Sequence, residues 1–109
     1  MTIENFLPLS FDWKDIPTEI VKGEIGHAII KTQNIGVIQI REVEYSSGYV
    51  ADHWCDKGHI VYIIQGDLII EHKDGLIHSL KSGMSYLIGD NTLSHKLKSG
   101  NGAKVLIID

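Results

Sequence analysis

A chain of 109 residues has room for one domain with a single hydrophobic core, which excludes a two-domain enzyme. Fourteen acidic against ten basic residues give a formal net charge of −4, the wrong sign for binding a nucleic-acid backbone. No apolar run approaches the roughly 20 residues of a membrane span, and the N-terminal stretch is too short and too broken for a signal peptide. Together with a lone cysteine, Cys55, these features predict a cytoplasmic protein without an intramolecular disulfide.

The first 25 residues lack regular apolar spacing, and we expect an irregular N-terminal arm over 1–25. A short helical turn is expected near Asp15, with Pro17 at a tolerated early position. The arm carries apolar side chains that would be a liability if exposed on a monomer. These are Phe6, Leu7, Leu9, Phe11 and Trp13. We expect them to pack either on the chain's own core or against a partner.

The remainder, 26–109, is predicted to be an all-β barrel. Eighteen isoleucines and six valines against nine leucines and three alanines favour pleated sheet over helix. Short apolar blocks alternate with turn signals at the spacing of a β-sandwich or barrel. The expected strands are 26–32, 35–45, 49–55, 59–65, 67–73, 76–81, 84–88, 94–98 and 103–109.

Four side chains are candidate metal ligands. Alternation along the expected strand 49–55 places His53 and Cys55 on one face, and a turn over 56–58 returns His59 to that face. His95 follows a separate strand bounded by Gly83. Taken alone, Cys55 would be interpreted as a small buried hydrophobe and His95 as part of a solvated loop. The spacing of the group favours metal binding.

The identity of the metal follows from the ligand types. Three imidazoles and a thiolate suit Zn²⁺, Cu or Ni better than they suit manganese, and imidazole also admits ferrous iron. Zinc is therefore the first expectation, with iron, nickel and copper as alternatives. The other histidines have simpler interpretations. A two-residue turn at Asp74–Gly75 would pair His72 with Ile77 and Glu71 with His78 in an exposed ladder, and His27 is assigned to the surface or a subunit interface.

Three further residues are candidates for a ligand pocket: Arg41, Tyr45 and Tyr86. Arg41 and Tyr45 share a largely apolar strand face, where an arginine is costly unless it is paired. Its partner would be Glu44, Asp52 or an acidic ligand entering the barrel. Tyr86 is also interpretable as a core or interface residue.

The glycines and ligand candidates together resemble the two sequence motifs of the cupin superfamily. The first motif is matched by Gly48, His53, Cys55, His59 and Gly66, and the second by Gly83, Gly89-Asp90-Asn91, His95 and Ser99. More narrowly, Ala51-Asp52-His53-Trp54-Cys55 and Lys57-Gly58-His59 are similar to the small bacterial DHCW-motif cupins, with Trp and Cys in the opposite order. The resemblance covers about residues 35–109.

The resemblance implies a jelly-roll barrel with a metal held by His53, Cys55, His59 and His95, a small-molecule ligand and a homodimer. Two functions remain open. One is a metalloenzyme acting on a small polar or acidic compound, which requires an open coordination position. The other is a non-catalytic binding or sensing module in which four protein ligands close the site.

Overall fold

The described residues form an almost entirely β structure, which confirms the predicted all-β class. The computed structural model describes residues 3 and 5–109. The secondary structure within them is a single 3₁₀ turn, η1 (Trp13–Asp15), followed by strands β1 (Thr18–Lys22), β2 (His27–Ile35), β3 (Ile38–Tyr45), β4 (Tyr49–Val50), β5 (His59–His72), β6 (Ile77–Lys81), β7 (Ser85–Ile88), β8 (His95–Ser99) and β9 (Ala103–Ile108).

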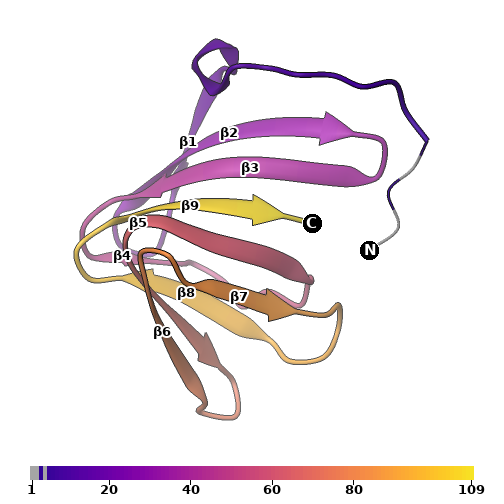
Figure 1. Cartoon of the computed structure of the whole chain (residues 1–109). Coiled ribbons are helices and arrows are strands. Elements are labelled where there is room, and N and C mark those ends of the chain that lie inside the picture. Colours follow the sequence, from indigo (N-terminus) through magenta and orange to yellow (C-terminus); the bar gives the residue numbers. More distant parts are fainter. Residues whose placement is uncertain (1–2, 4) are drawn as a thin grey trace.

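The strands form one sheet that curls on itself. Its hydrogen-bonded order is β1-β2-β3-β9-β5-β8-β4, with β6 and β7 also paired to β5, and every pairing is antiparallel. Figure 1 shows β2, β3 and β9 along one side of the molecule and β6 and β8 along the other, with β5 between them. The curled sheet encloses its own core, as expected for a closed barrel of this size.

Strand β5 belongs to both sides of the barrel. Its first half pairs with β7 and β9, and its second half, from Asp67, pairs with β6 and β8. β5 changes its partner strands next to Gly66, where φ is +86°. The pairing with β9 is irregular just before this glycine, between Ile63 and Gln65. A glycine reaches this left-handed region at little cost, so the strand can bend there without breaking.

The core consists of aliphatic and aromatic side chains that alternate with outward-facing residues along the strands. On β9, for example, Ala103, Val105 and Ile107 are buried while the residues between them are only half-buried. The buried apolar residues are Ala28, Val43, Tyr45, Tyr49, Ala51, Val61, Ile63, Leu68, Ile70, Leu80, Tyr86, Ala103, Val105 and Ile107. The period-two pattern from which the strands were predicted is the one that builds this core.

Two expected boundaries differ from the observed strands. The structure places β1 inside the segment expected to be irregular, where it pairs with β2 along its whole length. The expected strand 49–55 is regular only at Tyr49–Val50, because the chain then leaves the sheet and returns through a single bridge between Cys55 and His95. Thr18–Lys22 is therefore regular within the segment expected to be an irregular arm, and the alternation predicted for His53 and Cys55 does not apply.

The β5–β6 hairpin has a different register from the predicted one. Glu71 pairs with Ile77 and Ile70 with His78, a shift of one residue. The loop contains three residues instead of two, with Gly75 at φ +95° in the position that closes such a loop. His78 therefore lies on the same face as Ile70 and His72, and His72 is buried at 3% exposure, so the prediction of an exposed ladder is wrong.

The apolar side chains of the arm are largely exposed. Phe6, Leu7 and Leu9 are exposed to solvent, and Phe11 contacts Trp13 edge-to-face. Their assignment to a homodimer interface stays a prediction. No helix within the described residues is long and apolar enough to cross a membrane.

We predict that Gly66→Ala destabilises the protein more than Gly75→Ala. Both positions have a positive φ, which costs a residue with a Cβ about 1–3 kcal/mol. A methyl group at position 66 would also collide with the carbonyl oxygen of Gly102, whereas nothing lies within 4 Å at position 75. Urea denaturation should show an additional loss of about 1 kcal/mol or more for Gly66→Ala, and equal losses would contradict the proposed role of the close approach.

Candidate metal centre

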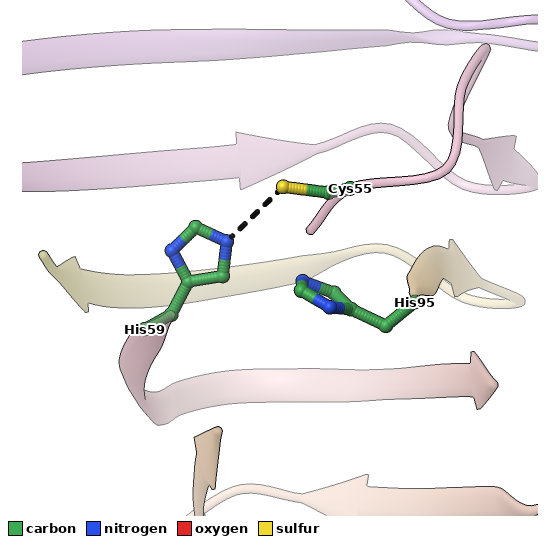
Figure 2. A group of neighbouring side chains, drawn as sticks. All are labelled: Cys55, His59 and His95. Carbon is green, nitrogen blue, oxygen red and sulfur yellow. Dashed lines mark hydrogen bonds between the residues drawn. The ribbon is translucent and has the colours of Figure 1, made fainter. Parts of the chain in front are cut away.

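Three side chains with metal-ligating atoms converge at one end of the barrel: Cys55, His59 and His95. One ligand atom from each lies within 4.8 Å of the others. Sγ of Cys55 and Nε2 of His59 are 3.6 Å apart. The rings of His59 and His95 pack edge-to-face, with their centroids 5.2 Å apart. Figure 2 shows the three side chains pointing toward a common centre from separate segments of the chain.

The backbone fixes the relative positions of Cys55 and His95. The N–H of each residue donates to the carbonyl oxygen of the other, at 2.8 and 2.9 Å. This reciprocal pair anchors the loop that follows β4 to the first residue of β8. Cys55 is therefore held at the site by a single β-bridge to His95 and not by a regular strand.

His59 is oriented by a buried carboxylate. Its Nδ1 lies 2.7 Å from Oδ2 of Asp109, whose side chain is only 2% exposed. A carboxylate only accepts hydrogen bonds, so Nδ1 carries the proton and, in the neutral ring, Nε2 presents its lone pair toward Cys55. Such a carboxylate–histidine pair is the usual arrangement behind a metal-binding imidazole.

The same carboxylate neutralises Arg41. Nη2 of Arg41 lies 2.9 Å from Oδ2 of Asp109, and Nζ of Lys57 lies 3.8 Å from Oδ1. Asp109 is therefore the carboxylate that Arg41 requires, and it is none of the expected partners Glu44, Asp52 or a bound acid. Arg41 pairs with Ile107, so alternation past Val105 and Ile107 puts Asp109 on the same face as Arg41.

His95 is the most deeply buried member of the group. The residue is 1% exposed, and neither ring nitrogen has a hydrogen-bond partner among the described residues. Burial lowers the pKa of His95 below its usual value, and the nearby His59 lowers it further. A buried imidazole without a partner is costly, and coordination to a metal ion would satisfy one of its nitrogens.

The fourth predicted ligand, His53, lies outside the group. Its side chain is 72% exposed and its Nδ1 is 2.6 Å from Oδ1 of Asp52, in the loop between β4 and β5. Asp52 thus pairs with the neighbouring histidine and not with Arg41, of which it was one of the expected partners. The structure brings together three of the four predicted ligands.

An interior cavity of about 230 Å³ adjoins the group. Cys55, His59 and His95 form part of its wall, and the predicted pocket residues Arg41, Tyr45 and Tyr86 line it as well. The exposed residues Asp52 and His53 lie at its rim. Much of the remaining wall is aliphatic, contributed by Ala28, Ile30, Val43, Ala51, Val61, Ile70, Leu97 and Ile107.

His72 and Tyr86 form a polar contact that the sequence did not reveal. The Tyr86 hydroxyl lies 2.9 Å from Nε2 of His72, behind the cavity, and His95 lies on the neighbouring strand at a ring distance of 6.4 Å. Alternation along β5 places His72 on the interior face with the buried Leu68 and Ile70, so the expected strand 67–73 already contained this signal. The hairpin register, with its three-residue loop, decides only the face on which His78 lies.

Comparison with solved structures identifies the fold. A predicted oxalate decarboxylase from Thermotoga maritima has a TM-score of 0.77 and 13% identity over 92% of this chain and 96% of its own. The chain has the cupin fold. An RmlC-like cupin from Shewanella frigidimarina has a TM-score of 0.64 and 19% identity, covering 84% of this chain and 81% of its own. Ectoine synthase from P. lautus has a TM-score of 0.74 and 15% identity, covering 93% and 76%.

Sequence comparison adds nothing narrower to the cupin assignment. No family model matches the chain, and no curated protein matches it. The similarity to DHCW-motif cupins therefore stays a prediction. The interior position of the Cys55, His59 and His95 group in this cupin barrel rests on its own geometry and not on a relative.

We predict that the metal-free cupin domain loses stability as the pH falls below about 6.5. Burial lowers the pKa of both His59 and His95, and for His59 the hydrogen bond to Asp109 opposes the shift only in part. The unfolded chain binds these protons first, near the ordinary histidine pKa of about 6.5. The stabilisation is therefore complete above that pH and is lost as the pH falls through the lowered folded-state values.

Urea denaturation with a chelator at pH 8 and pH 5 measures this loss. His95→Gln should lose less stability between the two pH values than the wild type does. The control His27→Gln, at an exposed position on β2, should behave as the wild type. An identical loss in His95→Gln would show that the buried imidazole does not carry the effect.

Proposed function

We propose that this cupin binds one zinc ion through Cys55, His59 and His95 and uses it to act on a small molecule in the interior cavity. The observation that carries the proposal is the convergence of three ligand atoms within 4.8 Å on the wall of that cavity. In a tetrahedral zinc site, bonds of about 2.3 Å to sulfur and 2.0 Å to nitrogen separate the two ligands by roughly 3.5 Å. The 3.6 Å between Cys55 and His59 fits this geometry.

The number of ligands favours an open site over a closed one. Structural zinc sites use four protein ligands, whereas catalytic sites use three and leave the fourth position to water or substrate. His53 is exposed and hydrogen-bonded to Asp52, so it leaves a position free. The alternative of a non-catalytic, closed sensing module requires His53 to swing inward and give up that contact.

The chemistry expected of the site is Lewis-acid catalysis. A bound divalent ion would polarise an oxygen of the ligand, while Asp109 holds His59 in the tautomer that presents Nε2. Two cupin-fold structures similar to this chain are named as enzymes: the polyketide cyclase RemF from Streptomyces resistomycificus, with a TM-score of 0.77 and 17% identity over 94% of this chain and 78% of its own, and the ectoine synthase. These names support an enzymatic role in general and indicate no particular substrate.

Zinc is preferred because of the ligand types. A thiolate with two imidazoles is softer than the oxygen-rich sets that bind manganese, and it suits zinc, copper or nickel. Ferrous iron is also compatible with imidazole ligands. Metal analysis of the untagged protein distinguishes these ions directly.

We predict one bound metal ion per chain in the wild type, lost on removal of any one of the three ligands. Cys55→Ala, His59→Ala and His95→Ala should each bind metal at least about tenfold more weakly, measured by plasma mass spectrometry after dialysis. His53→Ala is the matched control and should keep its metal, because His53 lies outside the group. If His53→Ala lost metal as well, the site would have four ligands and the closed alternative would stand.

Cobalt substitution tests whether the position is open. A thiolate-bound cobalt ion in an open site should change its visible spectrum when azide or another small ligand is added. A spectrum that does not respond would contradict the proposed catalytic role while leaving metal binding intact.

We predict that Asp109→Asn weakens metal binding by about 10- to 100-fold, the range typical of residues that orient a ligating histidine. The amide leaves His59 without its carboxylate acceptor and leaves Arg41 unpaired. Asp52→Asn is the control, because Asp52 makes the same kind of contact to Nδ1 of a histidine that lies outside the group. Competition with a chromophoric chelator measures both affinities, and equal effects would show that Asp109 has no special role.

A further inference from the structure

Two hydroxyl groups in the wall of the cavity have no hydrogen-bond partner. Tyr45 and Tyr49 are each 8% exposed, and their rings lie 4.6 Å apart. Among the described residues, neither hydroxyl takes part in a hydrogen bond, and neither is among the buried polar atoms that lack a partner. The two hydroxyl oxygens are therefore accessible from the cavity, and both are available to a ligand. By contrast, the hydroxyl of Tyr86 in the same wall is used by His72.

The surroundings keep Tyr45 neutral and place a positive charge beside it. Burial raises the pKa of Tyr45 far above its usual value, the neighbouring Tyr49 raises it further, and the charge of Arg41 opposes the shift. Tyr45 is therefore a donor at every physiological pH. Arg41 and Tyr45 both line the cavity.

The unused hydrogen-bond donors inside the cavity favour a ligand that brings acceptors, such as a carboxylate. Asp52, the acidic residue among the described wall residues, lies at the rim, is 58% exposed and is engaged with His53, although its charge also raises the pKa of Tyr49. Asp109 lies behind the wall, where one carboxylate is shared by two cations, Arg41 and Lys57. The Nε of Arg41 is buried without a partner, so the pair with Asp109 does not use all of its donors.

The size and the walls of the cavity define the rest of the ligand. A volume of about 230 Å³ is below the roughly 300–1,000 Å³ of pockets for drug-sized molecules. The aliphatic wall suits a short, branched or unbranched hydrocarbon body. A molecule with one anionic end and an apolar body matches both parts of the cavity.

We propose that the cavity binds a small aliphatic carboxylate, with its carboxylate group on the hydroxyls of Tyr45 and Tyr49 beside Arg41. The proposal deepens the proposed function by naming the class of compound that would meet the Cys55, His59 and His95 group. Any reaction of that compound at the metal rests on the proposed function. Binding of the carboxylate requires no metal, so it can be tested separately from metal binding.

Three probes with one carbon skeleton test the charge preference: isovalerate, isovaleramide and isoamylamine. Binding to the full metal-free chain is measured by calorimetry and by amide chemical shifts, with Cys55→Ala as a second metal-free form. We expect isovalerate to bind at least about tenfold more tightly than the amide, because a charge-assisted hydrogen bond is stronger than a neutral one. We expect no binding of the amine. Equal affinities, or no binding of any probe at millimolar concentration, would overturn the proposal.

Matched tyrosine variants test the location. Tyr45→Phe and Tyr49→Phe should each weaken isovalerate binding about tenfold, whereas Tyr86→Phe should leave it within about twofold. Melting curves establish that the variants are folded. An equal loss in all three variants would place the carboxylate elsewhere and contradict the proposal. Carboxylate binding that persists in a chain that takes up no metal would support this proposal and refute the proposed function.

Discussion

The buried carboxylate of Asp109 holds together the end of the barrel that contains the candidate site. It lies after β9 and accepts from Arg41 on β3 and from His59 on β5, so one side chain joins three adjacent strands. Each partner would be costly to bury alone. The guanidinium of Arg41 would be an unpaired charge in an apolar wall, and Nδ1 of His59 would lose its hydrogen-bond acceptor. The arrangement is stable because all three groups satisfy one another.

The opposite side of the site is not balanced in this way. His95 comes from β8 with both ring nitrogens unpartnered, and Nδ1 of His72 on the next strand is also buried without a partner. An aliphatic side chain in either place would avoid that cost. Natural cores contain few such groups, and they concentrate where a ligand or ion completes them. The polar groups around Asp109 are therefore paired, whereas those of His95 and His72 are not. This difference supports a functional centre independently of the distances between the ligand atoms.

Much of the barrel could be predicted from the sequence because period-two alternation is a local property. The alternation of Arg41, Val43 and Tyr45 correctly indicated one interior face, and eight of the nine expected strands, all except 49–55, overlap an observed strand over most of their length. The strand β1 was not found, because its five residues are all exposed and leave no alternating pattern. The unbroken β5 was divided at Gly66, where a glycine that bends a strand looks the same in sequence as one that ends it.

The candidate site was predictable as a set of residue types but not as a set of contacts. Spacing alone identified Cys55, His59 and His95, although the strand that was expected to align His53 with Cys55 does not extend so far. Asp109 was missed because its partners are 50 and 68 residues away in the chain. Contacts of that range depend on the register of three strands, which local patterns do not encode.

The departure of His53 from the group has a physical origin that also bears on the ligand. The loop after β4 leaves the sheet, and Asp52 offers His53 a hydrogen bond at the surface that no interior position would match without desolvating both groups. The cost of bringing His53 inward keeps the ligand group at three. It also keeps the Asp52 carboxylate at the rim, where it is engaged with His53 and not with the donors of Arg41 and Tyr45 inside the cavity. The same local contact thus supports an open metal position and leaves the interior donors to a ligand.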